Sequence, residues 1–263
     1  MSKLVDRTPP LWIVAHRGAN REAPENTRVA FDAALIHPID GIELDVQMSK
    51  DGVPVLYHDR TLAKIKGGRK RIADFSHQEL RQSDWGGWFS DAFRGERILT
   101  LDEVLQLYGE QTRLLIEIKS RDKDRRSGMS RALTSCTLEL LKKRVPSAYT
   151  ENIFILSFDA EVLRSAYSQA AGWKYVLNVS DPFSVTKQHR SELDGLYAYG
   201  VPIRRLTKEF VDMAHTQGQC VMTYSCNVPQ QVTKALNLNV DVMLTDKPGW
   251  LVGYLKHLCS HLQ

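Results

Sequence analysis

The stretch Gly41-Ile42-Glu43-Leu44-Asp45-Val46-Gln47-Met48 decides the fold. Apolar side chains alternate in it with polar ones, and this is the pattern of a β-strand with two different faces. Glu43 and Asp45 share one face, while the other face is wholly apolar and must be covered by further structure. A second stretch, 113–119, repeats the pattern with Glu117 and Lys119 on one face.

The apolar neighbours of these charged residues are expected to pack under helices outside the sheet. They are Ile42, Leu44, Val46, Leu115, Ile116 and Ile118. Strands covered by helices are typical of a parallel sheet, in which most strands are followed by a helix.

The rest of the chain supplies the same alternation of strand and helix. We expect eight main strands, at residues 11–15, 41–48, 113–119, 152–157, 174–178, 195–199, 219–224 and 240–244, with a short extra strand at 53–57. Helices are expected to begin near Asn26 or Thr27, and near Thr100, Ser130, Asp159, Thr207, Pro229 and Pro248. Eight βα units favour a closed (β/α)₈ TIM barrel, and no GxGxxG follows the first strand to support an open dinucleotide-binding sheet.

Residues 60–97 interrupt this alternation. They are rich in Lys, Arg and Gly and contain Trp85, Trp88 and Phe89. A structureless loop of this length is unusual in a compact domain, so we expect helical turns within it. We interpret the segment as a small insertion in one domain that spans residues 1–263.

Composition places the chain among ordinary globular proteins. It has 263 residues, 43% of them hydrophobic and 25% charged, and a formal net charge of +4. The basic runs at 64–71 and 119–131 lack interleaved aromatic residues, so nucleic-acid binding is not expected. Residues 1–10 lack the apolar stretch of a signal peptide, and no run is long enough to cross a membrane. With four scattered cysteines, this predicts a reduced, cytoplasmic protein without stable membrane association.

Three acidic residues are expected to meet at the mouth of the barrel. In this fold the carboxyl ends of the strands carry the chemistry, and Glu43, Asp45 and Glu117 lie late in two of them. Buried carboxylates repel one another unless a cation lies between them. All-oxygen ligation suits a hard divalent cation, Mg²⁺ or Ca²⁺. The alternative is that these acids form ion pairs with Arg17 and Lys119 inside the barrel.

Two histidines are expected beside the acids. His16 and His58 each close an apolar strand, and imidazoles that titrate near neutral pH suit a general acid and a general base on opposite sides of a phosphorus centre. Arg17 and Lys119 supply positive charge for a phosphate. The predicted site therefore has three chemical components: carboxylates, imidazoles and cations.

Seven motifs in order along the chain resemble the glycerophosphodiester phosphodiesterase family. They are His16-Arg17-Gly18, Pro24-Glu25-Asn26-Thr27, Glu43-Leu44-Asp45-Val46, Ser49-Lys50-Asp51-Gly52, His58-Asp59, Glu117-Ile118-Lys119 and Leu244-Thr245-Asp246-Lys247-Pro248. The resemblance implies a TIM barrel with an insertion after the second βα segment. It implies hydrolysis of diesters such as glycerophosphocholine and glycerophosphoethanolamine to sn-glycerol 3-phosphate and an alcohol.

The same resemblance implies roles for the residues. His16 and His58 would be the acid and the base, and Glu43, Asp45 and Glu117 would hold the divalent cation. In related enzymes the glycerol 2-hydroxyl attacks first, giving a cyclic phosphate that water then opens, and this step is an open possibility here.

Two segments depart from the pattern of many relatives. Residues 63–66 are Ala-Lys-Ile-Lys where an Arg-Thr-Thr segment is common, and Tyr224-Ser225-Cys226-Asn227 stands where Trp-Thr-Val-Asn is common. Both lie in pocket or rim positions, so they concern the preferred alcohol. Tyr224 is expected to line the substrate pocket.

Aromatic rings near the site offer a possible wall for the alcohol. Tyr224 and the insertion's Trp85, Trp88 and Phe89 could pack on a choline-like head group. The alternative is that the three insertion aromatics form the core of that segment.

Two other functions fit parts of this pattern. A lysophospholipase D would use the same site on a lysophospholipid, and would need an apolar groove or patch at the barrel mouth. A barrel that only binds phosphodiesters would be expected to have lost one of the two histidines or one of the three acidic ligands. Here all five are present: His16, His58, Glu43, Asp45 and Glu117.

Overall fold

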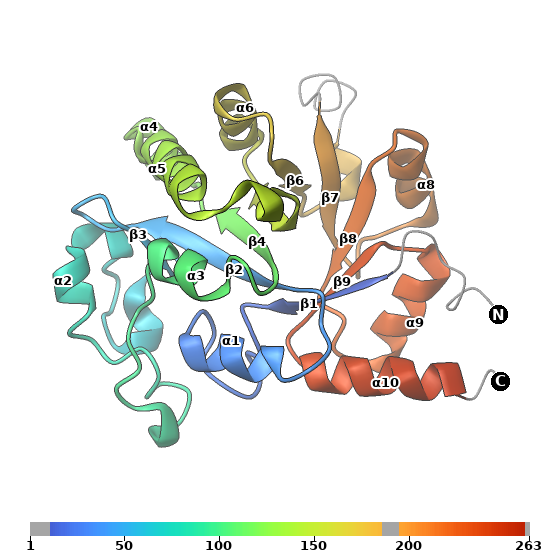
Figure 1. Cartoon of the computed structure of the whole chain (residues 1–263), viewed down its shortest axis with the longest axis horizontal. Helices are drawn as coiled ribbons and strands as arrows, with labels where there is room; N and C mark the ends of the chain where they lie inside the picture. The colour runs from blue at the N-terminus through green and yellow to red at the C-terminus, as the bar shows by residue number, and fades with distance from the viewer. Residues whose placement is uncertain (1–10, 186–194, 261–263) are drawn as a thin grey trace.

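The computed structural model of the chain describes residues 11–185 and 195–260, so residues 1–10, on which the signal-peptide prediction rests, lie outside it. Within the described residues nine strands form one sheet, and the eight other than β3 run parallel. β1 pairs with both β9 and β2, which closes the barrel. The predicted (β/α)₈ TIM barrel is confirmed (Figure 1).

The strands have the following bounds: β1 Trp12–His16, β2 Gly41–Met48, β3 Pro54–Leu56, β4 Arg113–Ile118, β5 Ile153–Ser157, β6 Lys174–Asn178, β7 Leu196–Pro202, β8 Cys220–Tyr224 and β9 Val242–Thr245. The α-helices are α1 Arg28–Leu35, α2 His77–Leu80, α3 Leu101–Tyr108, α4 Asp122–Arg126, α5 Met129–Arg144, α6 Ala160–Gln169, α8 Lys208–Thr216, α9 Pro229–Leu238 and α10 Pro248–Ser260. Every main strand predicted from the sequence is present, with bounds that shift by a few residues.

Side-chain caps explain where several helices begin. Thr27 accepts a hydrogen bond from the backbone N–H of Ala30 at the start of α1. Thr100 and Glu103 form a reciprocal capping box at the start of α3. Because the first turn of a helix has unpaired N–H groups, such oxygens set its first residue. The predicted caps at Thr27 and Thr100 are confirmed.

The apolar core has two layers, one on each side of the barrel wall. Ile42, Leu44 and Val46 lie in the outer layer, under the helices, as predicted. Leu115 was predicted there too, and that prediction is wrong: it lies in the inner cluster. Leu115 has the same parity as Glu117 along β4, so both side chains point into the barrel. The inner cluster thus packs the barrel interior and leaves the polar side chains at its mouth.

The inner cluster consists of Val14, Leu115, Phe154, Leu156, Val176, Ala198, Met222, Val242 and Leu244. Side chains from many strands therefore meet on the barrel axis, as in other packed TIM barrels.

The insertion after β3 has a small core of its own. It contains the short helix α2 and three 3₁₀ turns, at Leu62–Ile65, Ile72–Asp74 and Asp91–Phe93. Trp85 is buried in it and donates from its indole nitrogen to the carbonyl of Leu80. The prediction of helical turns is confirmed, and Figure 1 shows the segment beside β3, at one side of the barrel.

None of the described helices combines the length and the apolar composition that are needed to cross a bilayer.

Candidate active site

Three carboxylates converge because of the strand register. β2 and β4 pair so that Asp45 is directly opposite Glu117, and Glu43 is one inward position earlier on β2. Each of the three residues is at least nine-tenths buried. One carboxylate oxygen from each lies within 4.8 Å of the others. The sequence prediction that these acids share one site is therefore realised in the geometry.

Two cations lie among the acids. The Nζ atom of Lys119 is 2.7 Å from Oδ1 of Asp45 and 2.5 Å from Oε1 of Glu117. The Nε atom of Arg17 is 3.1 Å from Oδ2 of Asp45. The ion pairs foreseen as an alternative to a metal site are thus present. They do not balance the site, because two cationic side chains face three carboxyl groups.

The excess of negative charge in the site affects Glu43 most. Burial, and then the charges of Asp45 and Glu117, raise the pKa of Glu43 well above its ordinary value. Burial also opposes ionisation of Asp45, but Lys119 and Arg17 outweigh it and lower the pKa of Asp45. Clustered carboxyl groups without enough positive charge are expected to behave in this way.

The donor set fits a hard divalent cation. All three groups offer carboxylate oxygens, the ligands that Mg²⁺ and Ca²⁺ prefer. Oδ1 of Asp45 is buried, and its nearest cationic partner among the described residues is the Lys119 ammonium at 2.7 Å. A carboxylate oxygen has two lone pairs, so one remains available for a metal beside this ammonium.

Two amide side chains hold the carboxylates in place. Asn26 donates to Oδ2 of Asp45 at 2.9 Å, and Asn178 donates to Oε2 of Glu117 at 3.2 Å. The sequence suggested Asn26 only as an alternative cap of the first helix, a role that Thr27 takes, and it gave no role to Asn178. The available signal for Asn178 was its position as the last residue of β6, the place where His16 stands in β1.

His16 is held by a carboxylate that sequence reasoning assigned no role. Its Nδ1 atom lies 2.7 Å from Oδ1 of Asp246. Asn20 donates a hydrogen bond to the same oxygen, and Asn227 donates to Oδ2. Burial opposes ionisation of Asp246, but the hydrogen bond with His16 and its other partners lower its pKa. An ionised Asp246 requires Nδ1 of His16 to donate, and Nε2 is then left for chemistry, 3.9 Å from Glu43.

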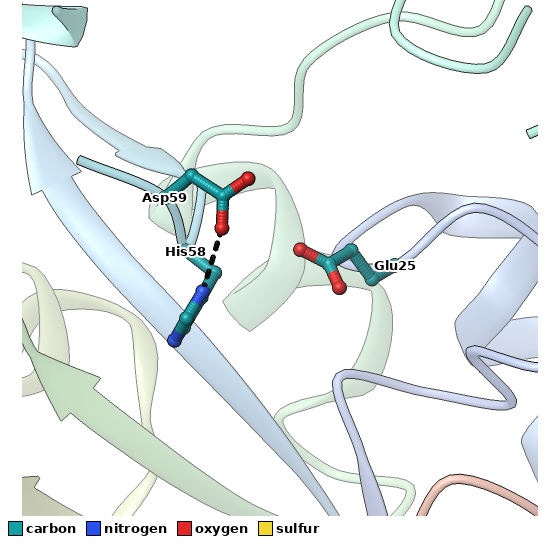
Figure 2. A group of neighbouring side chains, drawn as sticks. All are labelled: Glu25, His58 and Asp59. Atoms are coloured by element: carbon teal, nitrogen blue, oxygen red, sulfur yellow. Dashed lines mark hydrogen bonds and ion pairs between the residues drawn. The ribbon is translucent and has the colours of Figure 1, made fainter. Parts of the chain in front are cut away.

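His58 has an equivalent support (Figure 2). Its Nδ1 atom lies 2.9 Å from Oδ1 of Asp59, and the other ring nitrogen points away from both carboxylates drawn there. This hydrogen bond, opposed by burial and aided by Lys64, lowers the pKa of Asp59 to about 2. The imidazole therefore donates from Nδ1 here as well.

Glu25, His58 and Asp59 also lie close enough together to suggest a metal site. Lys64 already lies between the two carboxylates, with its ammonium 2.6 Å from Glu25 and 3.1 Å from Asp59. The same ammonium lies 4.8 Å from the centre of the Trp88 ring. This lysine comes from the segment that departs from the common Arg-Thr-Thr pattern.

The aromatic wall suggested for choline is only partly present. Trp85 is buried in the insertion core, Lys64 covers the Trp88 ring, and Phe89 packs edge-to-face against Trp88. The alternative, that these aromatics form the core of the insertion, holds for Trp85, whereas Trp88 and Phe89 are half-buried and lie outside that core. Tyr224 does lie beside the acids: burial, and then the charge of Glu117, raise the pKa of its phenol.

Known proteins share this arrangement of motifs and strands. The sequence model of the glycerophosphoryl diester phosphodiesterase family matches residues 16–250. The chain belongs to this family. It is accordingly a phosphoric diester hydrolase of the glycerophosphodiester phosphodiesterase class.

Similar proteins cover almost the whole chain. A glycerophosphodiester phosphodiesterase of Caldanaerobacter subterraneus is 30% identical over 93% of this chain and 97% of its own. The solved structure of an Oleispira antarctica phosphodiesterase in complex with the product sn-glycerol-3-phosphate has a TM-score of 0.83 at 26% identity, covering 93% of this chain and 96% of that one. A Thermotoga maritima glycerophosphodiester phosphodiesterase has a TM-score of 0.73 at 26% identity, covering 93% and 98%.

Removing the buried ammonium tests the electrostatics of the site. We expect Lys119→Met, measured by urea unfolding in EDTA, to lower the free energy of unfolding by roughly 3 kcal/mol, because it leaves buried carboxylates without their nearest cation. The matched control Lys123→Met removes an exposed lysine, and should change stability by less than about 0.5 kcal/mol. Equal effects of the two changes would contradict the ion-pair account.

Proposed function

We propose that this protein hydrolyses glycerophosphodiesters to sn-glycerol 3-phosphate and an alcohol. The main observation behind this proposal is a pair of imidazoles beside the acidic cluster. The Nδ1 atom of each is hydrogen-bonded to a carboxylate. This arrangement leaves two Nε2 atoms for proton transfer at one site. The Oleispira structure, which holds sn-glycerol-3-phosphate on a similar fold, supports the same product class.

Glu43, Asp45 and Glu117 would hold a divalent cation, Mg²⁺ or Ca²⁺, in this proposal. When bound, the cation supplies positive charge that stabilises the phosphoryl oxygens. The uneven balance of two cations against three acids, and the approach of one oxygen from each acid to within 4.8 Å of the others, support it.

His16 and His58 would share the proton transfers. One Nε2 accepts the proton of the attacking hydroxyl, from water or from the glycerol 2-hydroxyl, as a new O–P bond forms. The other Nε2 donates a proton to the alcohol oxygen as its bond to phosphorus breaks. Asp246 and Asp59 hold the ring orientations needed for this, as the carboxylate does in other carboxylate–histidine pairs.

Arg17, Lys119 and Tyr224 would complete the substrate pocket. Burial disfavours the charge of Lys119, but Asp45 and Glu117 outweigh it and raise its pKa, so its ammonium is held charged near the phosphate position. The Arg17 guanidinium is held charged in the same way, chiefly by Asp45 against the effect of burial. Fixed positive charge of this kind stabilises charge that develops on phosphoryl oxygens.

Lysophospholipid hydrolysis is a second candidate, and one observation favours it. Phe158 is 45% exposed and Phe183 is 81% exposed. They follow β5 and β6, at the carboxyl ends of the strands, so they place apolar surface at the mouth. We rank this activity second, because Phe158 shares its cavity with the charged residues Asp159 and Arg164, and Asp181 accepts a hydrogen bond from the backbone N–H of Phe183.

We also propose a cytoplasmic location and a single catalytic domain over residues 1–263. No disulfide joins the four cysteines, which suits a reducing compartment. The family match over residues 16–250 supports one domain that includes the insertion.

Purified protein with Mg²⁺ or Ca²⁺ should release glycerol 3-phosphate from glycerophosphocholine, glycerophosphoethanolamine or a related diester. EDTA should abolish release, and excess cation should restore it, because the acids need that charge. A coupled assay for glycerol 3-phosphate measures this. No release from any such diester, or faster turnover of a lysophospholipid in the same assay, would overturn the leading proposal.

The histidines should be needed for turnover and not for folding. His16→Ala and His58→Ala are each expected to lower kcat by about 10³-fold, since each removes a proton-transfer group. Asp59→Asn should also lower kcat, because without the carboxylate the His58 ring can adopt the tautomer that carries its proton on Nε2 instead of Nδ1. Circular dichroism should show wild-type folding in all three; unfolding of both alanine variants would mean that the histidines are structural.

A further inference from the structure

A second cavity opens next to the acidic cluster. It has a volume of about 720 Å³ and lies between the insertion and the segment that follows β4. This volume is within the usual range of small-molecule sites. Its charged lining is strongly one-sided, with six cationic residues and one acid: Arg60, Arg69, Arg71, Lys119, Arg121, Lys123 and Asp124.

The cavity is continuous with the active site. Lys119, which contacts Asp45 and Glu117, is part of its lining. Arg121 reaches across to donate a hydrogen bond to the backbone carbonyl of His58 at 3.2 Å. A substituent that extends from the acidic cluster past Lys119 would enter this cavity.

Most of its positive charge is not compensated by the protein. Lys119 and Arg71 have acidic partners, the latter Asp74 at 3.4 Å and Asp124 at 3.7 Å. Arg60, Arg69, Arg121 and Lys123 form no ion pair with any carboxylate in the described part of the chain. Arg121 is also half-buried: burial lowers its pKa, with Arg60 acting in the same direction and Asp124 opposing them. An anion in the cavity would remove this repulsion.

The insertion is folded so that it presents Arg69 to the cavity. The backbone N–H of Leu62 donates to the carbonyl of Lys70 at 2.8 Å, which closes the segment between them. Gly67 lies against Leu62, where a Cβ atom would be 2.5 Å from the Leu62 Cβ, and Gly68 has a φ of +65°. This tight turn needs both glycines, and it places the basic segment opposite Arg121.

We propose that this cavity binds the alcohol half of the substrate, and that the preferred alcohol carries a negative charge, as a phosphate or a carboxylate on a polyol. The inference rests on the proposed diesterase activity and deepens it. Guanidinium groups bind such anions through paired hydrogen bonds, and they repel a cationic head group such as choline. Lys64, which covers Trp88, further reduces the aromatic surface available to choline.

A matched pair of substrates tests the inference. We expect kcat/KM for glycerophosphoinositol 4-phosphate to exceed that for glycerophosphoinositol, which differs by that one phosphate, by at least tenfold at low ionic strength. The excess should shrink as salt is added, because exposed charges are screened. Glycerophosphocholine should be the poorest of the three.

Variants locate the preference in the cavity. The triple change Arg60→Gln, Arg69→Gln and Lys123→Gln should reduce the preference for the phosphorylated diester to below about threefold, since exposed pairs each contribute up to about fivefold. Lys256→Gln, an exposed lysine on α10, should leave the preference unchanged. Circular dichroism checks that both variants are folded.

Three outcomes would overturn the inference. Equal kcat/KM for the two inositol diesters, or a preference that survives in the folded triple variant, would mean that the cavity does not select the alcohol. The third outcome is that the wild type binds phosphatidylserine vesicles, the triple variant does not, and neither prefers one diester head group over another. That result would assign the basic surface to membrane binding. If the wild type hydrolyses unphosphorylated glycerophosphoinositol, the diesterase proposal holds, and these three outcomes then contradict only the inference about the cavity.

Discussion

The convergence of three buried carboxylates is the constraint on which the rest of the site depends. Glu43, Asp45 and Glu117 meet because β2 and β4 are neighbouring parallel strands in fixed register. Burial and mutual repulsion make their ionisation unfavourable. Arg17 and Lys119 relieve part of this, yet the pKa of Glu43 is still raised. A bound divalent cation is the simplest source of the missing positive charge, and the same charge suits a phosphodiester.

The imidazoles and the basic cavity are arranged around that cluster. Asp246 and Asp59 each take the Nδ1 hydrogen of a histidine, so both Nε2 atoms are left for the substrate. Beyond Lys119, excess cations line a cavity large enough for the leaving alcohol. One electrostatic principle thus operates in two places: the acids need a cation, and the basic cavity needs an anion.

Much of this was predictable from residue alternation and motif order. Strand periodicity placed Glu43 and Asp45 on one face, and the eightfold count predicted the barrel. Alternation applied consistently would also have placed Leu115 inside the barrel with Glu117. Other features depend on contacts between distant segments, which periodicity does not report: Asn178 reaches Glu117 across 61 positions, and Asp246 reaches His16 across 230. The role of Lys64 depends in the same way on how the insertion folds back over Glu25 and Asp59.

Calorimetric titration with Mg²⁺ and with Ca²⁺ tests the central claim most directly, because it measures the cation at the acidic cluster without any substrate. We expect one site per chain in the wild type, and clearly weaker binding in Glu43→Gln, which keeps the shape of the side chain and removes one ligand charge. Unchanged affinity in Glu43→Gln would contradict the assignment of these carboxylates as the metal site.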